Sequence, residues 1–332
     1  MTKISSTKPD ISIIIPAYNE AESLRELCPW INQVLKEHEL SYEILVIDDG
    51  STDNTSNLIR EMIESKADSN LKLIRFIRNY GKSAVLYTGF QMARGTTILS
   101  MDADLQDSPD EIPELYHQLR DRQFDLISGW KKDRKDPFIK RISSRLFNYI
   151  TSRVSGIPIH DFNSGLKIYR KEVAQNIYLH GEMHRYIPLI AHRNGFLRIA
   201  EKSVIHYPRK YGKSKYKSDR FLKGFLDLLS ISFVSRFRER PMHFFGGCGL
   251  SFFLIGSLLV LYLIGNKKYN LMQGIPVREV VDQPLFYLSL ITVIIGVQMF
   301  LTGFLAEILS LHFSRKENYL IAEKLGFDNK NT

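Results

Sequence analysis

The short motif Asp102-x-Asp104-x-Gln106 offers the sharpest chemistry in this sequence. Two carboxylates and an amide oxygen are hard ligands, which suit Mg²⁺ or Mn²⁺ ions that keep waters and bind substrate phosphates. Pairs of aspartates also occur simply as turn or helix-cap residues. The motif follows a short apolar, β-branched run at Thr97–Met101, and a place at the end of a buried strand favours the metal-binding interpretation.

Other polar residues that follow apolar runs each allow a structural and a functional interpretation. Asp48 and Asp49 suit either the loop and cap of a helix or a carboxylate that accepts hydrogen bonds from a nucleobase or ribose. Tyr18 fits either a packed aromatic side chain or one that stacks on a base. Glu20 is also typical of the first turn of a helix, where the helix dipole favours an acid.

An alternation of short strands and helices must position these groups. Such an alternation predicts an α/β fold with a mostly parallel, doubly wound sheet, whose ligand crevice lies beyond the carboxyl ends of the strands. The polar residues above, with Lys82 after the third strand, then converge at one edge. We predict strands at Ile11–Ile15 (ended by Pro16), Glu43–Ile47, Leu71–Ile77, Thr97–Met101 and Phe124–Ser128, and helices at Ala21–Glu37, from Thr52–Thr55 to Ile63, and at Ser83–Ala93.

Several familiar motifs are missing from the sequence. No G-x-G-x-x-G follows the first predicted strand, and neither G-x-x-x-x-G-K-[ST] nor G-x-S-x-G occurs. His and Cys residues with the spacing of zinc ligands are also absent. The sequence therefore argues against dinucleotide oxidoreductases, P-loop nucleotide hydrolases and zinc sites.

The average composition conceals a strong asymmetry along the chain. The 332 residues are 44% hydrophobic with a net charge of +9, and the mean hydropathy of −0.16 suggests an ordinary soluble protein. Yet residues 241–266 and 283–306 carry no charge, and each stretch can cross about 30 Å of hydrocarbon as a helix. Buried core helices are the alternative, which such length without charge disfavours. The short linker at 267–282 predicts a hairpin.

The charges around this hairpin predict its orientation. Arginines precede the first apolar stretch and basic residues follow the second. The linker also carries Lys267, Lys268 and Arg278, so the bias is modest, but it still favours cytosolic ends. The N-terminus has no signal-peptide pattern. We therefore expect an integral protein of the plasma membrane, with Cys28 and Cys248 in different compartments and not disulfide-bonded. The expected organisation is a cytosolic catalytic domain at 1–216, an amphipathic juxtamembrane segment at 217–240, a transmembrane hairpin at 241–313 (helices about 241–265 and 285–312) and a cytosolic tail at 314–332.

The juxtamembrane segment combines aromatic and basic residues. Phe and Leu recur there at helical spacing between Arg and Lys, a pattern typical of a helix on an anionic membrane surface. A helix packed on the catalytic domain is the alternative, and both can hold on opposite faces.

Four segments in order carry a family resemblance: IIIPAYNE, ILVIDDGSTDNT, NYGKSAVLYTGF and LSMDADLQDSP. Together they resemble the family 2 inverting glycosyltransferases with the GT-A fold, and most closely the polyprenyl-phosphate glycosyltransferases of the dolichol-phosphate mannose synthase group. The resemblance covers about residues 10–220, and the hairpin fits bacterial members with two C-terminal spans. The Q-x-x-R-W motif of processive polysaccharide synthases is missing, which argues for transfer of a single sugar.

This resemblance implies a role for each matching residue. The nucleotide would be held by Pro16, Tyr18, Glu20, Asp49, Lys82 and Asp102. Mg²⁺ or Mn²⁺ on the diphosphate would be bound by Asp102, Asp104 and Gln106. The residues with implied catalytic roles are Asp104, Asp161 and Arg209, with 161–167 near the sugar and 184–186 over the donor site. The acceptor phosphate would be bound by Arg141, Ser144, Arg145, Arg209 and Lys215.

The chemistry of a lipid phosphate acceptor makes few further demands. A phosphate monoester has a second pKa of about 6, so its oxygen is already largely anionic at neutral pH and needs no strong base. The enzyme must instead hold two anions together, and residues 131–145 are rich in Lys and Arg, although a solvated basic loop would look the same. Direct attack on the anomeric carbon predicts inversion.

The expected function is therefore metal-dependent, inverting transfer of one sugar from a UDP- or GDP-sugar to undecaprenyl or dolichyl phosphate at the cytosolic membrane face. Transfer to another lipid, such as a diacylglycerol, and a non-catalytic nucleotide-binding scaffold remain as alternatives. Nucleic-acid binding is disfavoured, because many basic residues cluster near the spans and the expected phosphate site. The sequence leaves the sugar, the base and the oligomeric state open, since Gly246, Gly247 and Gly249 suit either association between copies or packing within the hairpin.

Overall fold

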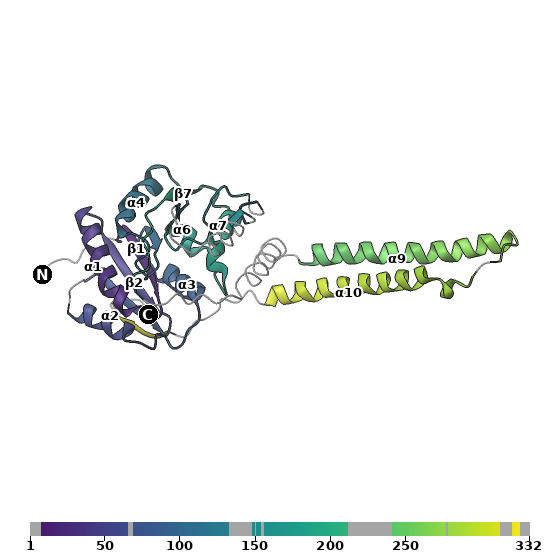
Figure 1. Cartoon of the computed structure of the whole chain (residues 1–332), viewed down its shortest axis with the longest axis horizontal. Coiled ribbons are helices and arrows are strands. Elements are labelled where there is room, and N and C mark those ends of the chain that lie inside the picture. The colour runs from purple at the N-terminus through teal and green to yellow at the C-terminus, as the bar shows by residue number, and fades with distance from the viewer. Residues whose placement is uncertain are drawn as a thin grey trace. The chain divides into compact units, whose positions relative to one another are not determined.

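The computed structural model describes residues 8–65, 69–132, 148–149, 151–153, 156–211, 241–276, 278–312 and 321–325. The chain divides into two compact units. The first, the catalytic unit, comprises residues 1–228 and 318–332, and the second, the hairpin unit, comprises residues 229–317. Figure 1 shows the elements of both units. The expected amphipathic helix within 217–240 lies outside the described residues.

One sheet forms the centre of the catalytic unit, and its described strands follow the order β7-β5-β6-β4-β1-β2-β3-β8. β6 and β8 run antiparallel to their neighbours, and the other strands are parallel to one another. The predicted mostly parallel sheet is therefore confirmed. The strands are β1 (Ile11–Ala17), β2 (Tyr42–Asp48), β3 (Leu71–Phe76), β4 (Thr97–Ser100), β5 (Leu126–Trp130), β6 (Lys167–Arg170), β7 (Ile199–Ser203) and β8 (Ile321–Leu325).

Helices cover the two faces of this sheet (Figure 1). Buried apolar residues of α1, α2 and α4 share one core with alternate residues of the strands, as the two-residue period of a strand requires. On the other face α3 comes so close that a Cβ atom at Gly89 would lie 2.6 Å from the Ile14 side chain. The helices are α1 (Ala21–Glu37), α2 (Thr55–Glu64), α3 (Lys82–Met92), η1 (Pro109–Glu111), α4 (Ile112–Asp121), α6 (Lys171–Gln175), η2 (Met183–Tyr186) and α7 (Ile187–Arg193).

The five predicted strands and three predicted helices of the N-terminal part are present, but the end of β1 was predicted wrongly. Pro16 does not end this strand, because it pairs with Ile47 of β2 and the strand continues to Ala17. The neighbouring β4 pairs with β1 only as far as Ile14, so the missing N–H of Pro16 costs no ladder bond on that side.

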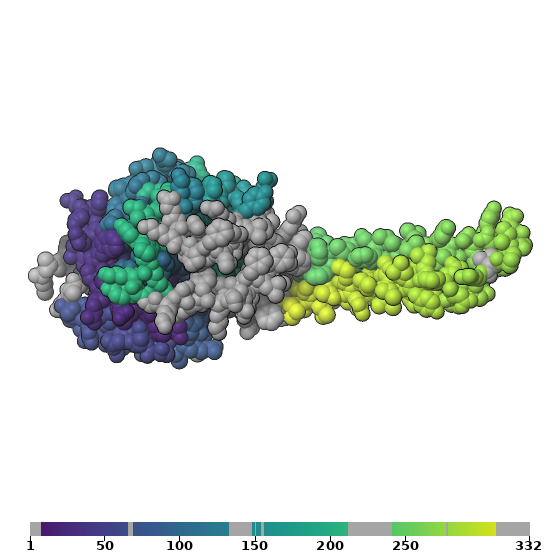
Figure 2. Space-filling view, viewed as in Figure 1, coloured from purple at the N-terminus to yellow at the C-terminus, as the bar shows by residue number. Residues whose placement is uncertain are grey.

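Two long apolar helices form the hairpin unit. These are α9 (Pro241–Met272) and α10 (Pro284–His312), joined through the short turn η3 (Val280–Asp282). Both are long and apolar enough to cross a membrane, and they include the predicted spans. Figure 2 shows the two helices in green and yellow. Large side chains such as Leu258 and Leu261 are each 64% exposed along their surface, an arrangement that suits lipid better than water.

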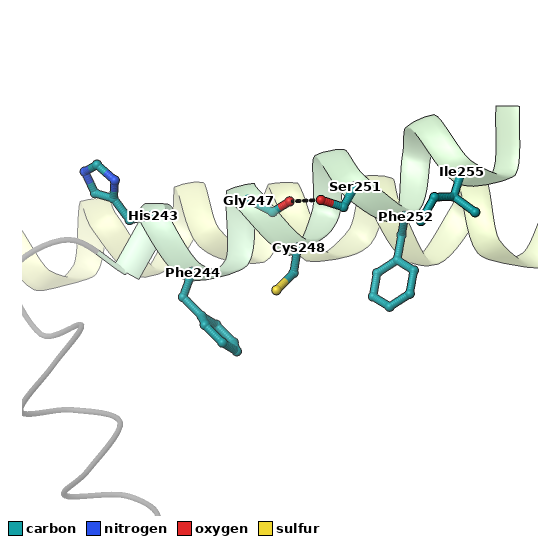
Figure 3. Close-up of a pocket in the computed structure, with 7 residues that line it drawn as sticks. All are labelled: His243, Phe244, Gly247, Cys248, Ser251, Phe252 and Ile255. Carbon is teal, nitrogen blue, oxygen red and sulfur yellow. Dashed lines mark hydrogen bonds between the residues drawn. The ribbon is translucent and has the colours of Figure 1, made fainter. Parts of the chain in front are cut away.

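Glycines set the contact between α9 and α10. A Cβ atom at Gly249 would lie 2.7 Å from the carbonyl oxygen of Gly296, and one at Gly303 would lie 2.8 Å from Phe245. Such small residues let backbones approach closely where water cannot drive association. Gly247 has no such neighbour. It belongs instead to an open groove of about 430 Å³ on α9 (Figure 3), lined by His243, Phe244, Gly247, Cys248, Ser251, Phe252 and Ile255.

Candidate active site

Hydrogen bonds join the loops that follow β1 and β2. The backbone N–H of Asn19 donates to the Ser51 hydroxyl at 2.9 Å, and the Asn19 amide oxygen accepts from the backbone N–H of Thr52 at 2.8 Å. Asn19 has a φ of 55°, a left-handed conformation that Asn tolerates better than most residues. The backbone N–H of Glu20 donates to the Thr55 hydroxyl at 3.0 Å. These bonds fix the start of α1 against the start of α2.

Asp48 and Asp49, where β2 ends, both use their carboxylates to hold backbone. Asp48 is fully buried and accepts from the backbone N–H of Ser51 at 2.8 Å. Asp49 accepts from the backbone N–H groups of Tyr80 at 2.7 Å and Gly81 at 2.9 Å. Burial, helped by the charge of Asp48, raises the pKa of Asp49 above its ordinary value. Asp49 therefore positions the loop between β3 and α3, and its contact with a nucleotide stays a prediction.

Asp102 lies just beyond β4 and contacts segments far from it in sequence. Lys82, the first residue of α3, donates to Asp102 Oδ1 at 2.5 Å. Gly165 approaches so closely that a Cβ atom there would lie 2.5 Å from Cγ of Asp102. A larger residue at this position would displace the carboxylate, so the segment before β6 helps to shape the space around this acid.

Asp104 is also paired with a cation. Arg209 donates to Asp104 Oδ2 at 3.1 Å and to Glu20 Oε1 at 3.4 Å, so one guanidinium links the ends of β4 and β1. Asp104 Oδ1 accepts from the backbone N–H of Gln106 at 3.2 Å. The intervening Leu105 has a φ of 58°, an uncommon conformation of the kind that collects at functional sites. The turn through Leu105 thus holds Asp104 against Arg209.

The two acids of the motif differ in their pKa. Burial opposes ionisation of Asp102, but the charges of Lys82 and Lys131 outweigh it and lower the pKa of Asp102 to about 2. Burial, together with the charge of Asp102, raises the pKa of Asp104 to about 6. Asp102 is therefore ionised at neutral pH, while the charge of Asp104 is held at an electrostatic cost that a bound cation would relieve.

A further acid adds buried charge next to this motif. Lys131 Nζ lies 2.7 Å from Asp107 Oδ1, and the Asp107 side chain has no exposed surface. Asp107 also pairs with His206 in an isolated antiparallel bridge, and the backbone N–H of Tyr207 donates to the carbonyl oxygen of Gln106 at 2.8 Å. The segment that follows β7 therefore runs alongside the end of β4.

The residues predicted to lie near the sugar come just before and within β6. Asp161 is 2% exposed, and its backbone carbonyl accepts from the Ser128 hydroxyl of β5 at 3.1 Å. Lys167 is also buried and donates to the carbonyl oxygen of Ser164. Burial lowers the pKa of Lys167 to about 7. Buried groups with such shifted pKa values cluster at functional sites.

His184 lies against the start of α3. Its backbone N–H donates to the Ser83 hydroxyl at 3.0 Å, and its Nδ1 lies 3.1 Å from the same oxygen. Burial, and then the charge of Lys82, lower the pKa of His184 well below its ordinary range, so the ring is neutral. The segment predicted to lie over the donor is thus placed beside the residue that contacts Asp102.

The structure gathers many of the predicted site residues at one edge of the sheet. Pro16 belongs to β1, Tyr18 follows it, and Gln106 donates from its amide nitrogen to the carbonyl oxygen of Tyr207 at 3.4 Å. Arg209, predicted to bind an acceptor phosphate, pairs here with acids. The other predicted acceptor residues lie outside the described part of the chain, namely Arg141, Ser144, Arg145 and Lys215.

Some contacts near this edge have no signal in the sequence. Glu26 of α1 accepts from Lys210 at 2.7 Å and from Tyr211, which anchors the segment that carries Arg209. Glu201 of β7 accepts from the backbone N–H of His160 at 2.6 Å. No motif or periodicity connects residues so far apart in the chain, so only the fold reveals these pairs.

The strand-end residues described above fall within one family match. Residues 12–178 match glycosyl transferase family 2. The chain belongs to this family. The range of this glycosyltransferase that matches the family contains the site acids Asp102, Asp104 and Asp161.

Known relatives extend the likeness to most of the chain. This glycosyltransferase is 35% identical over 319 residues to dodecaprenyl-phosphate galacturonate synthase of Rhizobium johnstonii, which covers 95% of this chain and 92% of the relative. It is 33% identical over 307 residues to undecaprenyl-phosphate 4-deoxy-4-formamido-L-arabinose transferase of Shewanella sediminis. This match covers 92% of this chain and 88% of the relative. The same name belongs to a protein of Pseudomonas fluorescens that is 33% identical over 255 residues, covering 76% and 72%.

A solved structure shares the fold of the catalytic unit. Glucosyl-3-phosphoglycerate synthase of Mycobacterium tuberculosis, in complex with Mn²⁺, UDP-glucose and glycerol 3-phosphate, matches with a TM-score of 0.52. The match covers 69% of this chain and 80% of that one at 18% sequence identity. This likeness agrees with the predicted GT-A fold.

The donor set suits a divalent cation that arrives with a phosphate ligand. Among the residues that the structure describes, no three His, Cys, Asp or Glu side chains gather closely enough to hold a metal ion. Mg²⁺ is usually bound through one or two carboxylates, water and substrate phosphates. Asp102 and Asp104, each already facing a cationic side chain, fit that pattern.

Proposed function

We propose that this family 2 glycosyltransferase transfers one sugar from a nucleotide-sugar donor to a polyprenyl phosphate, with inversion at the anomeric carbon. The observation that carries the proposal is a set of ion pairs beyond the strand ends, in which Asp102 pairs with Lys82 and Asp104 pairs with Arg209. Two membrane-length helices on the same chain favour a lipid acceptor. The relatives named for dodecaprenyl or undecaprenyl phosphate support this acceptor class.

Asp102 and Asp104 would hold Mg²⁺ or Mn²⁺, with Gln106 as the predicted third ligand. Bound there, the cation would neutralise negative charge on the diphosphate leaving group. Lys82 and Arg209 already donate hydrogen bonds to these two acids. Once the acids have another cation to balance, both side chains can donate to phosphate oxygens, which are strong acceptors for charged N–H groups.

The transfer itself needs little proton chemistry. An oxygen of the lipid phosphate forms a bond to the anomeric carbon while the bond from that carbon to the diphosphate breaks, so the nucleoside diphosphate leaves. The phosphate is already anionic, and no general base has to remove a proton from it. The protein must hold two anions close together, and Lys82, Lys131 and Arg209 supply positive charge around Asp102 and Asp104.

We also place the catalytic unit and both chain ends in the cytosol. Arg and Lys residues that precede α9 and follow α10 in the sequence support this orientation. Nucleotide sugars are then available to the site. Labelling of single cysteines, introduced into a chain that carries Cys28→Ser and Cys248→Ser, tests the orientation in intact cells and in opened vesicles. A cysteine at position 2 or 330 should react only after opening.

Reconstitution tests the proposed reaction. The purified full-length chain is incubated with undecaprenyl phosphate, Mn²⁺ and a panel of UDP- and GDP-sugars that includes UDP-galacturonate, and lipids are analysed by mass spectrometry. One donor should yield a lipid larger by a single sugar, with the anomeric configuration opposite to that of the donor. A chelator should abolish the product.

Two other outcomes would replace the proposal. A sugar found on diacylglycerol in place of undecaprenyl phosphate would show a different lipid acceptor. Donor binding by calorimetry without any transfer, across the whole panel, would show a nucleotide-binding scaffold. Asp104→Asn serves as the inactive control and Asp121→Asn, an exposed acid at the end of α4, as the matched active one.

A further inference from the structure

The chain returns from the hairpin unit to the catalytic sheet. β8 follows α10 in the sequence and pairs antiparallel with β3, the last of the parallel strands on that side. Leu73 lies opposite Leu325, Arg75 opposite Glu323 and Phe76 opposite Ile321. β8 (yellow, beside the sheet in Figure 1) thus covers a strand edge that would otherwise expose unpaired N–H and C=O groups.

The direction of β8 determines where the chain enters the sheet. β3 runs from Leu71 to Phe76, so Phe76 marks its carboxyl end, and the following loop leads to Lys82 at the start of α3. Ile321, the first residue of β8, pairs at this same end. The chain that comes from α10 therefore joins the catalytic unit at the edge that holds Asp102, and not at the opposite edge.

The other connection to the hairpin unit leaves from this edge as well. Arg209 pairs with Asp104 and Glu20, and Lys210 donates to Glu26 of α1. From there the sequence continues through residues 212–240 to α9. Both covalent connections thus meet the catalytic unit beyond the carboxyl ends of its strands.

The connection through β8 is short. Eight residues, 313–320, separate the end of α10 at His312 from Ile321. Even a fully extended chain spans at most about 3.3–3.6 Å per residue, which limits this connection to roughly 30 Å. The first connection, with 29 residues at 212–240, sets a much looser limit. While β8 stays paired, the shorter connection decides how far the active-site edge can move from the end of α10.

We propose that β8 is a tether strand, which keeps the active-site edge within reach of a phosphate held at the membrane surface. The inference rests on the proposed function, because it assigns β8 a role in the use of a lipid acceptor. A paired tether raises the effective concentration of one site for a ligand near the other. Loss of β8 should therefore raise the KM for the membrane-bound acceptor, and leave kcat and the affinity for the donor unchanged.

Two truncations separate the tether from the rest of the tail. Deletion of residues 321–332 removes β8, and deletion of 326–332 keeps it and serves as the matched control. Glu323→Pro, beside Glu323→Ala, tests the pairing without deletion, because proline cannot donate to a strand ladder. Circular dichroism and donor affinity by calorimetry verify that the catalytic unit is still folded.

Each variant is assayed with two acceptors. Undecaprenyl phosphate in vesicles should show at least a tenfold lower kcat/KM when β8 is removed or interrupted, carried by KM. A water-soluble phosphate of two isoprene units should show less than a twofold change. Equal losses with both acceptors would overturn the proposal and assign β8 to the stability of the site, and unchanged activity with both would also overturn it.

A cross-link tests the pairing independently of any activity. Arg75→Cys and Glu323→Cys place two thiols on directly opposed positions, in a chain that also carries Cys248→Ser. Oxidation in membranes should give a disulfide within one chain, seen by peptide mapping with no dimer on gels. A covalent dimer would show that β8 pairs with a second copy and would overturn the tether. If the full chain transfers no sugar to either acceptor while the internal cross-link forms, the proposed function fails and the strand pairing stands.

Discussion

At the carboxyl-end edge of the sheet, charged side chains from distant segments meet, whereas along the α9–α10 contact the backbones meet at glycines. Lys82 and Arg209 face Asp102 and Asp104 at the first place, and Gly249 faces Gly296 at the second. Charge removed from the edge should change chemistry and spare the fold. A side chain added at one of these glycines should change packing and spare the chemistry. The predictions below test this division of labour.

The largest effect is expected from Asp104→Asn. The carboxylate pairs with Arg209 and is one of two acids proposed to bind the cation, so its loss removes transition-state stabilisation of the leaving group. We expect transfer to fall by about 10²–10³-fold or more, in the range of other lost electrostatic contacts in active sites. Single-turnover assays with Mn²⁺ measure the fall, and Tm should stay within a few degrees of the parent. Activity above a tenth of the parent value would remove Asp104 from the metal site.

Gly165→Ala should give the next largest effect, although it changes no charge. The added Cβ atom would lie 2.5 Å from Cγ of Asp102 and force the carboxylate away from Lys82. We expect transfer to fall by about 10–100-fold, as displacement of a catalytic group by about 1 Å can cost two orders of magnitude. Donor affinity, measured by calorimetry with Mn²⁺, should fall in parallel. Normal donor affinity and transfer would show that the edge tolerates movement of Asp102.

Gly249→Val tests the glycine contact between α9 and α10. A Cβ atom at Gly249 would lie 2.7 Å from both Gly296 O and Phe300 N, so the larger side chain must push the two helices apart. Overpacking of this kind costs about 1–3 kcal/mol. Gly247→Val, two residues earlier on the same helix and with open space around it, is the matched control. Thermal unfolding in detergent should show a lower Tm for Gly249→Val alone, and equal values for both variants would refute the glycine contact.

Strand patterning predicted the central parallel strands because continuous β-branched runs such as Ile11–Ile15 have a distinctive composition. It also placed the polar strand ends together, since parallel strands end at a common edge. The three helices of the N-terminal part follow from apolar spacing, as the buried positions of α1 illustrate. The hairpin could be predicted from the length of the two uncharged apolar stretches alone.

Sequence patterns could not predict the strands that pair with segments far away in the sequence. β6 is antiparallel and central, β7 consists of IAEKS with partly exposed side chains, and β8 lies beyond the hairpin. The partners of the site acids escaped prediction for the same reason. Arg209 lies 105 residues from Asp104 and 189 from Glu20, and such contacts arise only when the sheet has assembled.

The smallest effect concerns a buried acid far along the sheet from the site. Glu43 of β2 accepts from the Ser12 hydroxyl at 2.5 Å, Lys72 Nζ at 2.8 Å and the Arg94 backbone N–H at 2.6 Å. Burial opposes its charge, but the hydrogen bonds from Lys72 and Ser12 prevail and lower the pKa of Glu43. A lowered folded-state pKa means that the carboxylate stabilises the fold above the unfolded value of about 4.3 and loses this contribution as the pH falls through the folded value.

Glu43→Gln should therefore destabilise the catalytic unit by about 1–2 kcal/mol at pH 7, because one charge-assisted set of hydrogen bonds becomes neutral. The difference from the parent should shrink as the pH falls through the lowered folded-state pKa of Glu43, because below it both chains carry an uncharged side chain. Thermal unfolding at several pH values measures it, and transfer per folded molecule should stay within twofold. A pH-independent difference would mean that Glu43 acts through shape and not through charge. A loss of transfer without a loss of stability would break the division between charges that serve chemistry and contacts that serve the fold.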